Sequence, residues 1–395
     1  MSSKMPVKVI AFLSIFCAAA SLRAAGGAKP LKVIATDVVR KTIYHSPQTP
    51  GYTCWAETWL MPDGRIMVAF VQATGPLEGR PRTRRDVLKK LNWALGEKPE
   101  EVKYDMAGTS LELIYLASKD GGNTWEKVSA DPGATPMNTW VQGQRGLADG
   151  AIVRTVWGQY LPFYDVPHTG YLQWSRDGAK TWGAPLVFDT ASGQTWPRRL
   201  RVLRDGRMAL AGGFVSKVAT GETRDSVAER LQPALWVSDD QGQHWSPPLV
   251  VWNGKTGNGE CEEWDFAELP DGDLLGVIRA DTSGHRWQTL LKKNGNTWIA
   301  QPTQELWIPH SGQPDVLMTS EGIVLHLAQD GTAWTADKGA TWTYLEGNPR
   351  TQYYPSSVQL PDGRIFCVGH AGGDDYYIRK DQRIEAITFR LKVEK

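Results

Sequence analysis

The sequence predicts an all-β fold, a six-bladed β-propeller made of four-stranded antiparallel blades. Two interleaved repeats predict this fold, and they run from about residue 50 to the C-terminus. One repeat is an Asp-Gly pair between two apolar runs, and the other is a short segment that ends in Trp. Units of this size cannot bury both of their faces alone, so they must stack, and closed radial stacking gives a propeller.

The Asp-Gly repeat predicts one β-hairpin in each blade. Asp-Gly between two apolar runs is the strongest short-range hairpin signal. In the fifth copy Glu replaces Asp. The six pairs begin at Asp63, Asp149, Asp205, Asp271, Glu321 and Asp362.

The second repeat, which we call the clasp, has the form Ser-x-Asp-x-Gly-x-Thr-Trp. We expect the Asp carboxylate to bind nearby backbone N–H groups, the Gly to supply a positive φ, and the Trp to fill the space beneath the turn. The fourth copy has lost its Ser and its Asp. The five copies span residues 118–125, 175–182, 238–245, 291–298 and 335–342. The sixth blade has no clasp, and we expect residues 384–393 to complete it, with residues 32–39 adding a strand that closes the ring.

The N-terminus has the features of a secretory signal peptide over residues 1–24. Lys4 and Lys8 precede an apolar run at residues 9–20, and small residues follow. This run is too short for a membrane span, and no later stretch is long enough. We therefore expect a secreted or periplasmic protein with no membrane span in its mature chain. Residues 25–395 then form a single propeller.

One basic segment, residues 77–107, does not follow the repeats and is an insertion in blade one. Its apolar spacing fits a short helix. A solvated basic loop and a lid over an anionic ligand both remain open.

Composition argues against several classes of partner. The formal net charge of +1 offers no field for nucleic acid or an anionic membrane. No His or Cys pair has metal-ligand spacing, so we expect no metal and no cofactor. We expect a monomer. Cys54 and Cys261 begin equivalent strands of opposite blades, and with Cys367 they are expected to be buried free thiols.

The starts of the innermost strands should point at the central axis, and in this chain they are unusually charged. An unpaired buried charge is costly, so such a cluster is a candidate site. The polar residues found by counting back from each Asp-Gly turn are Glu57, Arg198, Arg199, Glu262, Glu263, Asp265, Gln313, Asp315, Tyr353 and Tyr354.

The clasps resemble the Asp boxes of the sialidase (BNR-repeat) superfamily, and the resemblance covers nearly everything after residue 50. It implies a Tyr nucleophile activated by a Glu, an Asp acid/base on an early loop, and three Arg that bind the substrate carboxylate. Residues 354–363 are similar to the segment around the family's nucleophile, which implies that role for Tyr354. Residues 262–279 resemble the stretch that holds the activating Glu and one carboxylate-binding Arg, which implies Glu263 and Arg279.

The chain also departs from the family pattern. Residues 51–57 lack the first of the three Arg that bind the substrate carboxylate in the family, a set that we call the clamp. Gln313 lies where blade five should supply another of these Arg. His370 lies where the family has a supporting Glu. A bidentate Arg grip is not readily replaced by Gln or His. Arg198, Arg199, Arg286 and Arg350 could substitute from other blades. Asp86 and Glu78 are the carboxylates on the first-blade loop that could serve as acid/base.

We expect a secreted exo-glycosidase that acts on a glycan or oligosaccharide and removes a terminal acidic sugar, with exo-α-sialidase as the favoured activity. One alternative is a two-carboxylate glycosidase that uses a pair among Glu57, Glu263, Asp265 and Asp315. Another is a propeller that binds glycan without catalysis.

Overall fold

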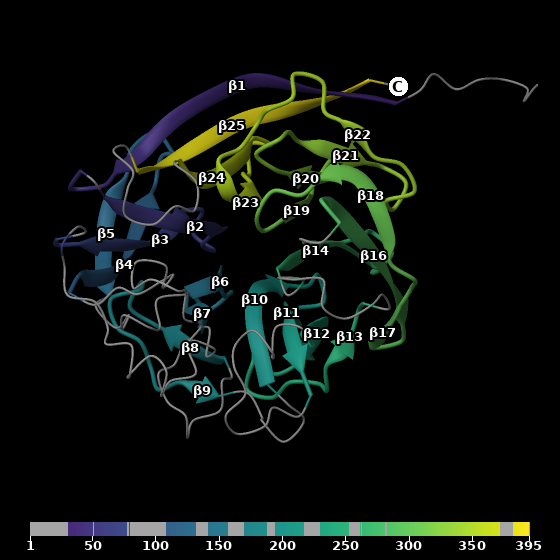
Figure 1. The fold of residues 1–395 in the computed structure, drawn as a ribbon, viewed down its shortest axis with the longest axis horizontal. Helices are drawn as coiled ribbons and strands as arrows, with labels where there is room; N and C mark the ends of the chain where they lie inside the picture. Colours follow the sequence, from purple (N-terminus) through teal and green to yellow (C-terminus); the bar gives the residue numbers. More distant parts are fainter. Residues whose placement is uncertain are drawn as a thin grey trace, which may run out of the picture.

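The protein is a ring of six β-sheets around a central axis, as the sequence predicts (Figure 1). The computed structural model describes residues 31–49, 51–76, 79, 108–131, 141–156, 170–187, 194–216, 230–252, 261, 263–280, 283–371 and 382–394. No helix occurs among these residues. The expected signal peptide and nearly all of the basic insertion at residues 77–107, including Glu78 and Asp86, lie outside the described residues.

Each of the first five blades is an antiparallel meander whose strands follow chain order from the axis outward. Blade one contains β2 (Tyr52–Leu60), β3 (Ile66–Thr74), β4 (Ser110–Ser118) and β5 (Glu126–Asp131). Blade two contains β6 (Val141–Gly146), β7 (Ile152–Val156), β8 (Tyr171–Ser175) and β9 (Leu186–Val187). Blade three contains β10 (Gln194–Val202), β11 (Met208–Val215), β12 (Gln232–Ser238) and β13 (Leu249–Val250). Blade four contains β14 (Trp264–Glu268), β15 (Leu274–Ile278), β16 (His285–Asn294) and β17 (Thr297–Ala300), and β18 (Gln304–Pro309) also pairs with β16. Blade five contains β19 (Asp315–Met318), β20 (Val324–Leu327), β21 (Ala333–Thr335) and β22 (Thr343–Tyr344).

Blade six joins the two ends of the chain. It contains β23 (Tyr353–Gln359), β24 (Ile365–Ala371) and β25 (Arg383–Glu394), and β1 (Lys32–His45) pairs antiparallel with β25 as the outermost strand. The pairing extends from Lys32 opposite Glu394 to His45 opposite Arg383, and Figure 1 shows the two long strands together along one side of the ring. The prediction that an N-terminal strand closes the ring is confirmed, and the pairing is longer than expected.

The Asp-Gly pairs form tight hairpin turns, as predicted. In blade one the Gly64 N–H donates to the Met61 carbonyl at 2.9 Å, and Gly64 has a φ of 84°. This φ is in the left-handed region, which favours glycine. The same turn recurs at Gly150, Gly206, Gly272, Gly322 and Gly363, with φ between 82° and 85°.

The clasps hold their turns through the Asp carboxylate, as predicted. In the second clasp Asp177 Oδ1 accepts bonds from the backbone N–H of Thr181 at 2.9 Å and from the Ser175 hydroxyl at 2.8 Å. The Trp has a wider role than the sequence indicated. Trp182 packs on Tyr115 of blade one, with ring centroids 5.8 Å apart, and Trp125 of blade one packs on Phe366 of blade six at 5.7 Å. The clasp therefore also joins neighbouring blades.

The clasp Asp should stabilise the fold even though it is only partly buried at Asp240. We expect Asp240→Ala to lower the melting temperature by a few degrees, because the His244 N–H and the Ser238 hydroxyl lose their acceptor. Asp239→Ala is the matched control, since it removes an exposed carboxylate one residue away. Thermal unfolding followed by circular dichroism checks the pair, and equal effects of the two substitutions would contradict this role.

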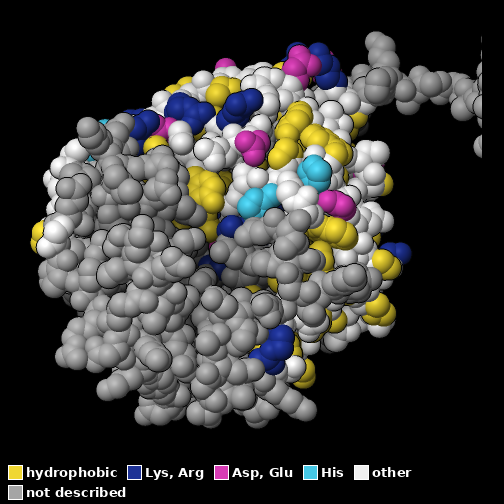
Figure 2. Space-filling model, viewed as in Figure 1, with side chains coloured by type: hydrophobic (Ala, Val, Ile, Leu, Met, Phe, Trp, Pro, Cys, Tyr) yellow, Lys and Arg dark blue, Asp and Glu magenta, His cyan; other side chains and the backbone are white. Residues whose placement is uncertain are grey.

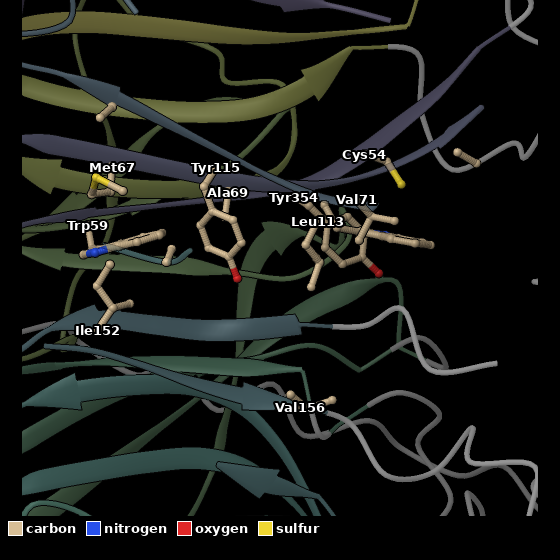
Figure 3. Packing of buried hydrophobic residues seen from close by; sticks show 14 of the residues in the cluster. Cys54, Trp59, Met67, Ala69, Val71, Leu113, Tyr115, Ile152, Val156 and Tyr354 are labelled. Carbon is tan, nitrogen blue, oxygen red and sulfur yellow. The ribbon is translucent and has the colours of Figure 1, made fainter. Parts of the chain in front are cut away.

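Apolar side chains from adjacent blades form the core. One cluster joins β2, β3 and β4 to residues of blades two and six, and it includes Trp59, Tyr115, Ile152 and Tyr354 (Figure 3). Cys54, Cys261 and Cys367 are buried and form no disulfide with one another, as expected. Among the described residues, no helix is long and apolar enough to cross a membrane.

Candidate active site

The innermost strands bring two layers of side chains to the axis. The lower layer comes from the position six residues before each hairpin Asp or Glu, and the upper layer from the position eight residues before. The two layers are defined by sequence position, because bulges interrupt the strand alternation between these positions in blades one, three and six. The lower layer holds Glu57, Gly143, Arg199, Asp265, Asp315 and Ser356, and the upper layer includes Trp55, Pro197, Glu263, Gln313 and Tyr354. Figure 2 shows Lys or Arg atoms near the centre of this face, close to His and apolar side chains.

β-Bulges reshape four of the six inner strands. The register shifts between Cys54 and Glu57, Gln142 and Arg145, Pro197 and Arg199, and Tyr353 and Ser356. Trp55 and Tyr354 lie in two of these bulges with φ of 53° and 51°, which is strained for bulky residues. Bulges and strained residues of this kind occur at functional sites, where they aim a side chain.

Tyr354, Glu263 and Arg279 meet in the upper layer although they come from two different blades. The Tyr354 hydroxyl donates to Glu263 Oε1 at 2.9 Å. Arg279 Nη1 donates to the Tyr354 oxygen at 3.1 Å and also to Glu263 Oε2. The three side chains that the family resemblance implies are therefore within hydrogen-bond reach of one another.

Glu263 is buried and ionised within a cluster of positive charge. Burial disfavours its charged form, but Arg279 and Arg198 outweigh burial and lower the pKa of Glu263 below its ordinary value. Arg198 Nη2 lies 3.2 Å from Glu263 Oε1. The carboxylate thus carries a negative charge directly beside the phenol of Tyr354.

The loop before β19 supports Arg279 from the other side. Arg279 Nε donates to His310 Nε2 at 2.9 Å. Arg286, which is fully buried, donates to the carbonyls of Ser311 and Gly312 at 2.7 and 2.6 Å. Gly312 has a φ of 56°, and a Cβ there would lie 2.9 Å from the ring of Tyr353. The loop is therefore fixed against the tyrosines.

Two of the predicted residues frame the ring of Tyr354. His370 is stacked on it with centroids 5.9 Å apart, and Tyr353 meets it edge to face at 4.8 Å. The backbone N–H of Trp55 donates to His370 Nδ1 at 3.1 Å. His370 is buried, so it contacts the tyrosine ring from within the protein.

Glu57 and Arg199 form one ion cluster in the lower layer. Glu57 Oε1 lies 3.4 Å from Arg199 Nη1 and 3.1 Å from Arg145 Nη1, and Glu57 Oε2 accepts the Gln144 N–H at 3.0 Å. Burial, followed by repulsion from Arg201, lowers the pKa of Arg145 to about 10. Glu57 therefore balances two guanidinium groups, and it is only 2% exposed.

Asp265 and Asp315 form a second cluster with Arg201. Arg201 binds the carboxylate of Asp265, and the Ser357 hydroxyl donates to Asp315. Burial opposes ionisation of Asp265, but Arg201 and Arg199 lower its pKa. Burial raises the pKa of Asp315, and the neighbouring charge of Asp265 adds to this. Two close carboxylates of this kind do not ionise equally.

This difference predicts unequal effects of two conservative substitutions. Asp265→Asn should lower the free energy of unfolding by about 3–5 kcal/mol, because it leaves Arg201 without its main counter-charge. Asp315→Asn should cost less than about 1.5 kcal/mol, because Arg201 lies 3.9 Å from Asp315 and has Asp265 as its direct partner. Urea unfolding at neutral pH measures the unfolding free energy of both variants. An equal or larger loss for Asp315→Asn would contradict Asp265 as the main counter-charge of Arg201.

The structure brings together nearly all of the described residues that were predicted from the sequence as site candidates. Tyr354, Glu263, Arg279 and Arg198 form one contact group, and Tyr353 and His370 adjoin it. Gln313 of the upper layer is buried, and Glu57, Arg199, Asp265 and Asp315 belong to the lower layer. Arg350 is exposed and belongs to neither layer. Asp86 and Glu262 lie outside the described residues.

Three contributing residues were missed or underrated from the sequence. Arg145 reaches Glu57 from a blade whose lower-layer residue is Gly143. Arg201 follows Arg199 by two positions on the same face of β10, a signal that the alternation of a strand could have given. His310 was not among the candidates named from the sequence, and it contacts Arg279 directly. Among the described residues, no group of three or more His, Cys, Asp or Glu side chains could hold a metal ion.

Fold and site together define a class of protein: a six-bladed propeller with a phenol, a carboxylate and several guanidinium groups converging at its hub. Comparison with protein-family models gives no match. A sialidase from Bacteroides fragilis is 22% identical over 243 residues, which cover 53% of this chain and 42% of that protein. The chain thus spans less than half the length of this relative.

Solved structures show the same architecture. An α-L-arabinofuranosidase mutant from Fusarium graminearum, in complex with an iminosugar inhibitor, has a TM-score of 0.59 at 14% identity and covers 89% of this chain and 98% of its own. A sialidase from Streptococcus pneumoniae has a TM-score of 0.58 at 11% identity, and the match covers 89% of this chain and 70% of the sialidase chain. An α-L-arabinanase from Penicillium chrysogenum has a TM-score of 0.57 at 15% identity, and the match covers 88% of this chain and 97% of the arabinanase chain. The chain therefore shares its propeller fold with these glycosidase structures.

Proposed function

We propose that this protein is a glycoside hydrolase that removes a terminal sugar from a glycan, with Tyr354 as nucleophile and Glu263 as its activating base. The observation that carries the proposal is the contact of the Tyr354 hydroxyl with Glu263 at 2.9 Å, beside Arg279. A nucleophile within hydrogen-bond reach of an oriented base is typical of covalent catalysis.

The site suits attack by a phenol. As the Tyr354 oxygen bonds to the anomeric carbon, its proton passes to Glu263, and Arg279 Nη1 stabilises the negative charge that develops on the oxygen. Because Glu263 is held by Arg279 and Arg198, it is oriented before substrate binds. The departure of the sugar's leaving group requires an acid, and we propose Asp86 of the first-blade insertion for that step. Water, deprotonated by Asp86, then displaces Tyr354 from the anomeric carbon, and the phenol regains its proton from Glu263. The two displacements together retain the anomeric configuration.

A carboxylated sugar such as sialic acid is the substrate we favour. A neutral nucleophile suits an anomeric centre that bears a carboxylate, since it is not repelled as a Glu would be. Arg279 lies beside the nucleophile, where it can bind such a carboxylate. The sialidases among the similar proteins support this reading. We propose that the protein acts after export, directed by residues 1–24.

A neutral sugar is the second candidate, and one observation favours it. The other arginines near the axis are already bound to protein groups: Arg198 to Glu263, Arg199 and Arg145 to Glu57, Arg201 to Asp265, and Arg286 to backbone carbonyls. Arg279 is itself bound to Glu263 and His310, so the arginines at the axis do not form an unoccupied clamp of three for a substrate carboxylate. Arabinose-cleaving enzymes also occur among the similar propellers.

A panel of aryl glycosides tests the proposal. It should include an aryl α-sialoside, an aryl α-L-arabinofuranoside and neutral hexosides, with release of the phenol as the signal. We expect turnover of the sialoside to exceed that of the others. Turnover of only a neutral glycoside would select the second candidate, and binding without turnover of any substrate would contradict hydrolysis.

A further inference from the structure

Arg199 of blade three contacts blades one and six, next to the peptide unit that follows Tyr354. It is 3% exposed, so it is too deeply buried to be an evident contact for substrate. Its Nη2 donates to the carbonyl of Pro355 in blade six at 2.7 Å. Its Nη1 faces Glu57 of blade one at 3.4 Å.

Pro355 is the residue that follows Tyr354 in the bulge of β23. The register shift between Tyr353 and Ser356 places both Tyr354 and Pro355 in the unpaired part of that strand. The backbone of Tyr354 is strained, with a φ of 51°. A strained bulge without ladder bonds keeps one conformation only when its surroundings impose it. The bond from Arg199 to the Pro355 carbonyl is such a constraint, and it acts on the peptide unit just after Tyr354.

The guanidinium of Arg199 is itself held in place. Glu57 accepts the backbone N–H of Gln144 at 3.0 Å and a bond from Arg145 at 3.1 Å, so its carboxylate has a fixed orientation. The planar fork of Arg199 can bind this carboxylate and the Pro355 carbonyl at once. A Lys side chain carries a single ammonium group and cannot reproduce both contacts with the same geometry.

We propose that Arg199 is a positioning residue, which acts through the Pro355 carbonyl to hold the Tyr354 hydroxyl in line with Glu263 and Arg279. This inference rests on the proposed function of Tyr354. It assigns Arg199 a role other than the substrate binding that its place at a strand start suggested. A misplacement of about 1 Å at the reacting atoms can cost on the order of 100-fold in rate, so the bond matters for turnover more than for affinity.

The test compares Arg199→Lys with Arg154→Lys in the whole chain. Arg154 lies on β7 of blade two, is similarly buried, and binds the Asp131 carboxylate at 2.6 Å and the Tyr115 hydroxyl at 3.0 Å, so it offers the same kind of contacts without touching blade six. Arg199→Lys should lower kcat by about 30- to 100-fold and change KM by less than about threefold. Arg154→Lys should change kcat by less than about threefold at a similar loss of melting temperature.

A double variant separates this idea from failure of the proposed function. If Arg199 acts through Tyr354, then Arg199→Lys should have no further effect on the residual activity of a Tyr354→Phe protein. Glu57→Gln, which weakens the support of Arg199, provides a second variant and should lower kcat by about tenfold. An unchanged kcat in either folded variant, or the same loss in the Tyr354→Phe background, would overturn the inference. An active Tyr354→Phe protein would instead overturn the nucleophile itself.

Discussion

Tyr354→Phe is expected to lower kcat by at least about 1,000-fold on the preferred aryl glycoside. The substitution keeps the ring, which stacks on His370, and removes only the oxygen that contacts Glu263 and Arg279. Substrate binding should persist, because the ring of Tyr354 and its neighbours keep their places. Steady-state kinetics, with binding measured by calorimetry, checks both parts.

Tyr353→Phe is the matched control for this experiment. Tyr353 adjoins Tyr354 in sequence and contacts its ring edge to face, and it is partly exposed. Loss of its hydroxyl should change kcat by less than about tenfold. Equal losses for the two tyrosines would show that Tyr354 has no special chemical role, and full activity of Tyr354→Phe would exclude the phenol as nucleophile.

Glu263→Gln is expected to damage both stability and turnover. It leaves Arg279 and Arg198 in a buried site without the carboxylate that both of them bind. Breaking a buried ion pair by removal of one partner costs about 3–5 kcal/mol of unfolding free energy. The loss of the base should lower kcat by about 100- to 10,000-fold. Urea unfolding and steady-state kinetics on the same preparations check the two effects.

The pH dependence of stability provides a control for the same substitution. The arginines lower the pKa of Glu263 in the folded protein, so its ionised form favours folding. Its contribution is complete above the unfolded pKa, about 4.3, and is lost as pH falls through the folded pKa. The difference in unfolding free energy between wild type and Glu263→Gln should therefore be constant near neutral pH and shrink below about pH 4. A difference that instead grew with acid would contradict an ionised Glu263.

The repeats allowed the fold to be predicted almost completely. Each Asp-Gly turn and each clasp is local, because a few neighbouring residues determine its geometry, as the bonds of Asp177 to Ser175 and Thr181 show. The closing strand was predicted by counting, since blade six lacked a fourth strand. The contacts of the clasp Trp with the next blade were missed, because local sequence does not say what lies across a blade interface.

The site was predicted in part, for a physical reason. Equivalent positions before each turn gave Tyr354, Glu263 and the charged residues of the lower layer. Their pairing could not be read in the same way, since it depends on how the bulges rotate each strand. The bulge of β6 ends at Arg145, four residues before the hairpin Asp of blade two, whereas the bulge of β2 ends at Glu57, six residues before the hairpin Asp of blade one. This offset accompanies the pairing of Arg145 with Glu57. Neither the displacement of the bulge nor the deep burial of Arg199 has a sequence signal.

Covalent trapping tests the central claim most directly. A fluorinated glycosyl fluoride of the preferred sugar should react fast and hydrolyse slowly, and so accumulate the glycosyl-enzyme intermediate. Peptide mass spectrometry should then find the added sugar on Tyr354, and Tyr354→Phe should remain unlabelled. Labelling of a carboxylate such as Glu263 or Glu57, in a protein that turns over the same sugar, would contradict the tyrosine mechanism.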